Sequence, residues 1–320
     1  MDLSLLSNLT SVSVLAFVLG GIGFALRADL RIPEQAYQVI SMTLLFGIGL
    51  KGGLALHKSN PADLIAPGLM TLGLGSLIPM LAFAALRLIK RLNNVDRGAI
   101  AAHYGSTSLV TFTSALVFLD ASNISYESYV NALLVIMEIP GILIGILLAS
   151  GIRNALGNRE LLREVILGKT VLLMLGGLII GLVSGTLGVE KVAPLFVDLQ
   201  PGILTLFLLN LGYLAMSRIG DLRTVGAGVA IFAVTFPLVA GFIGALAGTA
   251  FGMSVGGSAA LAVLCASASY IAAPAAVGLA LPQASTSLSL VSSLGITFPL
   301  NLTLGIPIYI AMSEALVGLV

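Results

Sequence analysis

Charged and chemically reactive residues are scarce in this chain of 320 residues. Only 9% of them are Asp, Glu, Lys or Arg, there is no Trp, and there are two His and a single cysteine, Cys265. One cysteine excludes an internal disulfide framework and a multi-cysteine metal site. The formal charge of +1 gives no support for nucleic-acid binding. We find neither a nucleophile–base pair nor a metal-ligand cluster, and we therefore predict that the protein is not an enzyme and uses no organic cofactor.

Apolar residues dominate instead, at 58% of the chain with a mean hydropathy of +1.10. This composition is typical of an all-α polytopic membrane protein, and the 37 glycines suit close packing of its helices. No basic segment precedes the first apolar run, so we expect a retained helix rather than a cleaved signal peptide. At about 20 apolar residues per crossing, ten crossings are predicted. They lie at residues 11–26, 35–56, 64–88, 98–119, 128–150, 168–187, 201–217, 224–250, 258–281 and 287–312.

The most polar stretch, residues 151–167, divides the chain into two halves of five crossings, residues 1–160 and 161–320. Most basic residues then fall on one side of the membrane, which predicts that this side is cytoplasmic and that both termini face outward from the cell inner membrane. The cytoplasmic set is Arg27, Arg31, Arg87, Lys90, Arg91, Arg97, Arg153, Arg159, Arg163, Lys169, Arg218 and Arg223, against Lys51, Lys58 and Lys191 outside.

The two halves resemble each other in three places that follow in the same order. Because each half has an odd number of crossings, the halves insert in opposite orientations, and the resemblance predicts two inverted five-helix repeats. The matching segments are 45–50 with 208–213, 105–108 with 266–269, and 139–140 with 298–299.

The stretch from Ala259 to Leu300 is apolar, yet it contains repeated Ser residues together with Pro274 and Pro299. An unbroken spanning helix needs none of these features, whereas a helix broken within the membrane uses hydroxyls to satisfy its freed backbone groups. Pro274 suits the first position of a new half-helix. A weaker copy of the pattern lies at residues 104–108 and 138–140. We therefore predict discontinuous fourth and ninth helices, which mark the binding site of a secondary transporter.

Half-helices that begin inside the membrane present unpaired N–H groups and about half a positive charge at their N-termini. Two such N-termini, from the fourth and ninth crossings, form an anion site that needs neither Arg nor Lys. No basic residue lies in the middle of either crossing. We therefore expect a small, singly charged anion rather than a phosphate or a dicarboxylate, which usually attracts a guanidinium group.

Glu138 is the only acidic residue near the centre of any predicted crossing. A carboxylate is costly in lipid and predicts a functional site. Together with hydroxyls and freed carbonyls, it offers hard oxygen ligands that suit Na⁺ or a titrating proton. A bound cation would neutralise Glu138 and allow the neighbouring site to accept an anion, which is a physical reason for coupled transport.

Three segments are similar to the SbtA-type sodium-dependent bicarbonate transporters: CASASYIAAPAA (265–276), LPQASTSLSLVSSLGITFPLN (281–301) with GIPIY after it, and GSTS…ISYESYVNALLVIMEIP (105–140). The likeness runs over most of the chain. It implies Na⁺-coupled symport of bicarbonate by an elevator mechanism, with a gate domain from helices 1, 2, 6 and 7 and a core domain from helices 3–5 and 8–10. It also implies a homotrimer in membrane lipid and a PII-like regulatory protein on the cytoplasmic face. The family has Asp where this chain has Glu138.

The resemblance also implies a set of site residues at the two breaks. The candidates for binding the substrate are Gly105, Ser106, Thr107, Ser108, Ser267, Ser269, Tyr270 and Ala273. The candidates for binding Na⁺ are Glu138, Ser108, Ser269, Thr297 and Asn301.

Several polar residues also have a purely structural interpretation. Transmembrane Ser and Thr often bond to a carbonyl one turn earlier, and Glu138 could serve as an interhelical contact. His103 fits a packed neutral histidine, Lys51 a lysine that extends to the membrane surface, and Asn210 a helix-packing contact. The rival functions are a sodium-coupled symporter of another small anion or an organic acid, as in the bile-acid carriers, and an anion channel. Substrate size tests the first, and saturable Na⁺-dependent flux tests the second.

Overall fold

A computed structural model describes residues 10–58, 61–151 and 159–319, and the regular structure in these ranges is helical. Residues 152–158 of the predicted link between the halves lie outside the described residues. The first half contains α2 (Val12–Ala25), α3 (Glu34–Lys58), η1 (Pro61–Leu64), α4 (Ile65–Leu86), α5 (Asn94–Gly105), α6 (Leu109–Ala121) and α7 (Val130–Ser150). The second contains α9 (Arg159–Leu167), α10 (Lys169–Glu190), η2 (Pro194–Asp198), α11 (Gln200–Ser217), η3 (Ile219–Asp221), α12 (Leu222–Ala250), α13 (Val255–Ala266), α14 (Ala272–Ala280), α15 (Thr286–Leu290), η4 (Val291–Thr297), α16 (Phe298–Leu300), η5 (Asn301–Gly305) and α17 (Ile306–Val317).

Seven helical runs within the described ranges are long and apolar enough to cross a membrane. Their outward faces carry large apolar side chains that no other part of the structure covers, such as Leu69 on α4 and Val183 and Leu187 on α10. A soluble protein would lose solubility with so many exposed apolar side chains, whereas lipid solvates them. The chain is therefore a polytopic α-helical membrane protein.

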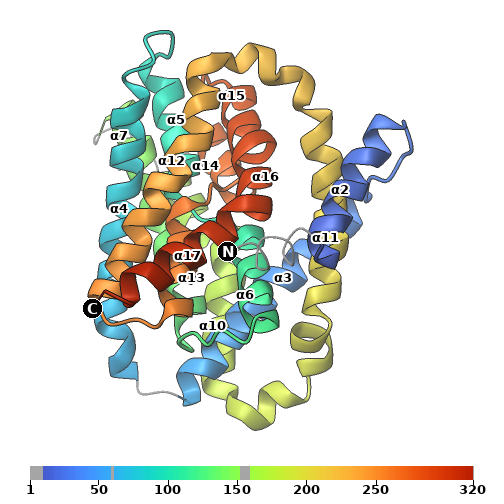
Figure 1. Ribbon diagram of the computed structural model, residues 1–320, viewed down its shortest axis with the longest axis vertical. Coiled ribbons are helices and arrows are strands. Elements are labelled where there is room, and N and C mark those ends of the chain that lie inside the picture. The colour runs from blue at the N-terminus through green and yellow to red at the C-terminus, as the bar shows by residue number, and fades with distance from the viewer. Residues whose placement is uncertain (1–9, 59–60, 152–158, 320) are drawn as a thin grey trace.

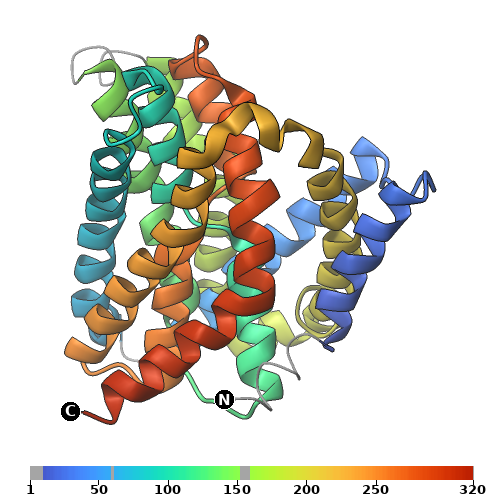
Figure 2. The same cartoon turned by 45° about the horizontal axis from the view of Figure 1, so that its top comes forward.

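Helices α2, α3, α10 and α11 form two packed pairs beside the rest of the molecule, and we call them the side layer. α2 packs along α11 and α3 packs along α10, and α2 and α11 lie side by side at the right of Figures 1 and 2. Small residues allow this close approach. A Cβ at Gly20 would collide with the carbonyl oxygen of Leu209. A Cβ at Gly212 would collide with that of Phe17.

Helices α4–α7 and α12–α17 form the main bundle, in which each half supplies a similar trio of helices. α5 packs against α4 and α7, and α13 packs against α12 and α17. Two carboxylates, one in the loop before α7 and one in the first turn of α5, join the halves at helix N-termini. Glu127 accepts a hydrogen bond from the backbone N–H of Ser254 at 2.6 Å, just before α13. Asp96 accepts one from Ser285 at 2.8 Å, just before α15.

Two helices of the main bundle are interrupted. α5 ends at Gly105 and α6 begins at Leu109, within the predicted fourth crossing. α13 ends at Ala266 and α14 begins at Ala272, within the predicted ninth. Pro274 is the third residue of α14 rather than the first as the sequence suggested. Any position in the first turn accepts proline, because the N–H groups there have no partner within the helix.

Pro140 and Pro299, which match each other between the two halves of the sequence, do not break their helices. α7 continues through Pro140 to Ser150. The run from Thr286 to Val317 is also helical throughout, with wider π-helical turns on both sides of Pro299. The main bundle is thus interrupted within predicted crossings at residues 106–108 and 267–271, and α12 has a further kink at Gly226 near its start.

Candidate functional site

The two helix breaks contact each other directly in the middle of the main bundle. The backbone N–H of Ser108 donates to the hydroxyl of Ser267 at 2.9 Å. The backbone N–H of Ser269 donates to the carbonyl oxygen of His103 at 2.7 Å. Non-helical backbone within a membrane must satisfy its polar groups inside the protein, and here each break supplies partners to the other.

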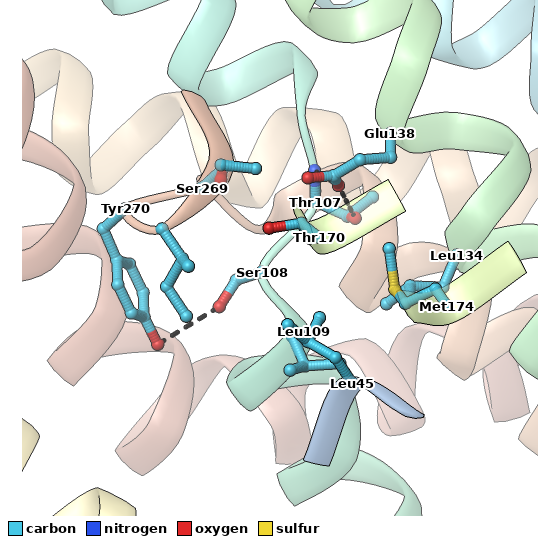
Figure 3. Close-up of a pocket in the computed structure, with 12 residues that line it drawn as sticks. Leu45, Thr107, Ser108, Leu109, Leu134, Glu138, Thr170, Met174, Ser269 and Tyr270 are labelled. Atoms are coloured by element: carbon cyan, nitrogen blue, oxygen red, sulfur yellow. Dashed lines mark hydrogen bonds between the residues drawn. The ribbon is translucent and has the colours of Figure 1, made fainter. Parts of the chain in front are cut away.

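A small central cavity lies beside the crossing breaks, with a volume of about 10 Å³, which is roughly the space of one water molecule. Most of its polar wall comes from the main bundle, with Thr170 contributed by α10, and Figure 3 shows these side chains turned toward one space. Its apolar wall includes Leu45 of α3 and Met174 of α10, both from the side layer. The lining residues are Leu45, Thr107, Ser108, Leu109, Leu134, Glu138, Thr170, Met174, Ser269, Tyr270, Ile271 and Ala272.

Glu138 is the one charged side chain among these lining residues, and only 2% of its surface is exposed. Its Oε2 accepts two hydrogen bonds from Thr107, one from the hydroxyl at 2.5 Å and one from the backbone N–H at 3.2 Å. Figure 3 shows the bond to the hydroxyl. A buried carboxylate beside a hydroxyl in a cavity of this size provides oxygen ligands for a small cation.

Hydroxyl groups form the other side of the central cavity. Ser108 is the N-cap of α6, and its hydroxyl accepts bonds from the backbone N–H and the hydroxyl of Thr111, at 3.2 and 2.9 Å. It also donates to the hydroxyl of Tyr270 at 3.4 Å. Ser269 accepts a bond from the backbone N–H of Ala273 at 3.3 Å. Each break thus places a serine against the first turn of the half-helix that follows it.

Both half-helix N-termini reach the central cavity. Leu109, the first residue of α6, and Ala272, the first residue of α14, belong to its lining. The first turn of a helix has N–H groups without helical partners and carries partial positive charge. No lysine, arginine or histidine lines this cavity, so the helix ends and the hydroxyls are the groups that would attract an anion.

The remaining predicted substrate residues are buried outside the central cavity. Gly105 packs against Pro79 and the backbone of Gly141, where a Cβ would come within 2.6 to 2.8 Å of its neighbours. Ser106 is buried, and Ser267 holds the backbone of the other break, as described above. Ala273 packs in a second apolar cluster of the core. These residues shape the breaks, whereas Thr107, Ser108, Ser269 and Tyr270 line the cavity.

Two predicted Na⁺ residues lie in a separate polar group. Thr297 donates to the carbonyl oxygen of Ala233 at 2.7 Å and bonds the hydroxyl of Tyr104 at 2.6 Å. Asn301 donates to the carbonyl oxygen of Ala266 at 2.9 Å and accepts from Tyr309 at 2.8 Å. Neither belongs to the lining of the central cavity, so the structure does not bring them together with Glu138. Asn301 instead satisfies the last carbonyl before the second break.

Four residues that α3, α7 and α10 contribute to the central cavity were not recognised from the sequence. Leu45, Leu134 and Met174 have the character of ordinary core residues, and no local pattern distinguishes them. Thr170 is the second residue of α10, next to the polar link between the halves. A polar residue is common at such a helix end, so its position in the sequence did not indicate a site. Only the packing of the side layer against the main bundle places them at the site.

A larger cavity of about 250 Å³ adjoins the central one, and we call it the vestibule. Both cavities are lined by Thr170, Ile271 and Ala272. The vestibule also contacts Glu164 and Lys169, at the end of the predicted cytoplasmic link.

A helical membrane protein with two crossing interrupted helices and a buried polar cavity between them has the architecture of a secondary transporter. The sequence model of the Na⁺-dependent bicarbonate transporter superfamily matches residues 13–314. The chain belongs to this superfamily. Comparison with individual curated proteins gives no match.

Proposed function

We propose that this protein takes up bicarbonate together with Na⁺ and binds both at the central cavity. The observation that carries the proposal is the joint presence of Glu138 and of two half-helix N-termini around one small cavity. The carboxylate provides the charge that a cation needs. The helix ends and hydroxyls provide the donors that an anion needs.

Coupling between the two ions follows from electrostatics. With Glu138 ionised and no cation bound, its negative charge repels an anion at the N-termini of α6 and α14. A Na⁺ ion held by Glu138 and Thr107 removes this repulsion and adds attraction. In a cavity with little water, such interactions between charges are much stronger than in bulk solvent. The site therefore favours binding both ions over binding the anion alone.

The cavity dimensions favour a small anion over the organic acids carried by bile-acid-type symporters. About 10 Å³ of free space admits a sterol only after a large rearrangement, whereas a four-atom anion needs a modest widening. The vestibule beside the cavity offers room for such widening on the side of α14 and α10.

We further propose an elevator-type movement in which the main bundle carries the site past the side layer. In support of this, Glu138 and the residues of both breaks that line the central cavity belong to the bundle, while Leu45, Thr170 and Met174 belong to the side layer. In this scheme the side layer is the gate domain, and α4–α7 with α12–α17 are the core domain. The ten crossings are the seven long runs, α2, and the interrupted pairs α5–α6 and α13–α14.

The remaining parts of the proposal come from the sequence. The distribution of basic residues supports cytoplasmic exposure of the link between the halves, and the vestibule would then open inward. The three matching segments support an inverted repeat, and the family resemblance supports a homotrimer and a PII-like partner.

Uptake of labelled bicarbonate into proteoliposomes tests the proposal. We expect saturable uptake that requires an inward Na⁺ gradient and stops when K⁺ replaces Na⁺. Uptake that neither requires Na⁺ nor saturates would identify a channel. Strong competition by bulky organic anions would point to an organic-acid carrier.

A further inference from the structure

A third cavity, of about 40 Å³, lies between the side layer and the main bundle, and we call it the outer cavity. α3, α6, α7, η2 and the first turn of α11 enclose it. Its lining differs from that of the central cavity because it contains a basic residue and two amides. The lining residues are Ile48, Lys51, Thr113, Leu116, Val117, Asp120, Asn131, Val197, Gln200 and Pro201.

Two buried amide side chains of the outer cavity have unsatisfied groups. Asn131 is 7% exposed and its Oδ1 accepts no hydrogen bond. Gln200 is 5% exposed and its Nε2 donates none. Buried polar atoms in native proteins nearly always have a partner, so an unpaired acceptor and an unpaired donor on one cavity indicate a ligand that offers both functions.

Lys51 supplies the positive charge of the outer cavity. Its side chain is partly buried, and among the residues that the structure describes no ion pair involves it. Asp120 also contacts the cavity, but its side chain is exposed and accepts a hydrogen bond from Tyr126 at 3.0 Å. The more deeply enclosed polar groups are therefore one ammonium, two amides and the hydroxyl of Thr113, which already donates to the carbonyl oxygen of Leu109 at 2.8 Å. This set suits an anion that can also donate one hydrogen bond.

The three cavities follow one another along α7. Asn131 lines the outer cavity, Glu138 the central cavity and Ile142 the vestibule. Asn131 and Glu138 are seven residues apart, which corresponds to about 10 Å along a helix. The outer and central cavities share no lining residue, whereas the central cavity and the vestibule share three. The outer cavity thus lies on the side of the central cavity that is opposite the vestibule.

We propose that the outer cavity is a capture site for the bicarbonate ion before it reaches the central cavity, an inference that rests on the proposed function. Bicarbonate has two oxygens that share its negative charge and one hydroxyl. The charged oxygens accept from the ammonium of Lys51 and the amide of Gln200. The hydroxyl donates to Oδ1 of Asn131. The volume of about 40 Å³ also accommodates a four-atom anion, whereas the central cavity in this conformation does not.

The capture site helps to explain how an anion reaches a transporter whose central cavity carries a negative group. Lys51 lies six residues from Leu45 on the same helix, which corresponds to about 9 Å along the axis, so its positive charge lies near the central cavity without lining it.

Initial rates of Na⁺-driven uptake of labelled bicarbonate into proteoliposomes test the capture site. We expect Lys51→Gln and Gln200→Leu each to raise the KM for bicarbonate about tenfold or more, because each removes a donor to a charged ligand. The half-saturating Na⁺ concentration and the maximal rate should stay near those of the unmodified protein. Lys51→Arg should keep a KM within about threefold, since it keeps the charge.

Lys58→Gln is the matched control, because Lys58 is an exposed lysine on the same helix that does not line the cavity. Its KM should be unchanged. Unchanged KM values in both Lys51→Gln and Gln200→Leu, with normal uptake by the unmodified protein, overturn the capture site alone. Absence of Na⁺-driven uptake by the unmodified protein overturns the proposed function and the capture site together. If Lys51→Gln fails to assemble, Gln200→Leu decides the question.

Discussion

Thr107 donates both its hydroxyl and its backbone N–H to the same oxygen of Glu138, at 2.5 and 3.2 Å. Thr107 lies in the first break, one residue before the N-cap of α6. The carboxylate therefore holds the backbone segment that orients a half-helix N-terminus toward the central cavity. Under the proposed function, a cation bound to this carboxylate is therefore linked through Thr107 to the backbone of the anion site.

Replacement of Thr107 should weaken Na⁺ binding without preventing assembly. Thr107→Val keeps the shape and removes one hydrogen bond to a charged group, worth about 1.5–3 kcal/mol. We expect the half-saturating Na⁺ concentration for uptake to rise about ten- to hundredfold, while Thr107→Ser stays near the unmodified value. Thr235→Val is a control, because Thr235 is exposed and bonds only to the carbonyl of Ile231 one turn earlier. An equal effect of both valine variants would contradict a specific role for Thr107.

Glu138→Gln should abolish Na⁺-dependent transport, because it removes the only charge on the wall of the central cavity. The protein should still fold, since a neutral amide is cheaper than a carboxylate to bury in a membrane. Glu138→Asp should retain activity with a changed Na⁺ dependence, because the charge remains and the side chain is shorter. The measurement is Na⁺ titration of bicarbonate uptake together with the yield of folded protein. Unchanged Na⁺ affinity in Glu138→Gln would remove Glu138 from the cation site.

Gly141 should be intolerant of any side chain. A Cβ there would collide with the carbonyl of Gly105 and come within 2.7 Å of the backbone nitrogen of Ser106, at the start of the first break. We expect Gly141→Ala to lower the thermal stability in detergent and to impair uptake, at a cost of about 1–3 kcal/mol for overpacking. Gly73→Ala on α4 is the control, since no atom lies within 4 Å of its added Cβ. Equal melting temperatures for the two variants would show that the contact between α7 and the break is loose.

The proposed orientation can be checked with single cysteines in exposed links. Asn123→Cys, between α6 and α7, should react with an impermeant thiol reagent added outside intact cells. Arg91→Cys, between α4 and α5, should react only after the membrane is permeabilised. Cys265 is 1% exposed and should give no background. The reverse labelling pattern would invert the topology predicted from the basic residues.

Much of the architecture is readable from the sequence because it depends on local properties. Hydropathy over about 20 residues reports whether a segment can lie in lipid, and it identifies a polytopic helical protein. Clustered hydroxyls in an apolar segment indicate where a helix can open, and both breaks lie inside the predicted crossings. Glu138 was identifiable because a lone acidic residue in an apolar segment is unusual at any position.

The crossing of distant helices decides which polar residues line the same cavity. The local sequence does not show which helices will cross. Thr297 and Asn301 resemble Ser269 in type and setting, yet they bond Tyr104, Ala266 and Tyr309 away from Glu138. The crossing brings Ser108 to Ser267 across 159 residues of chain, and the side layer adds Leu45 and Met174. Asn131, Gln200 and Lys51 likewise meet only because α3, α7 and α11 converge. The membrane class, the two breaks and the buried acid thus follow from short-range composition. The cavities and their lining do not, because contacts between distant segments arise only when the helices pack.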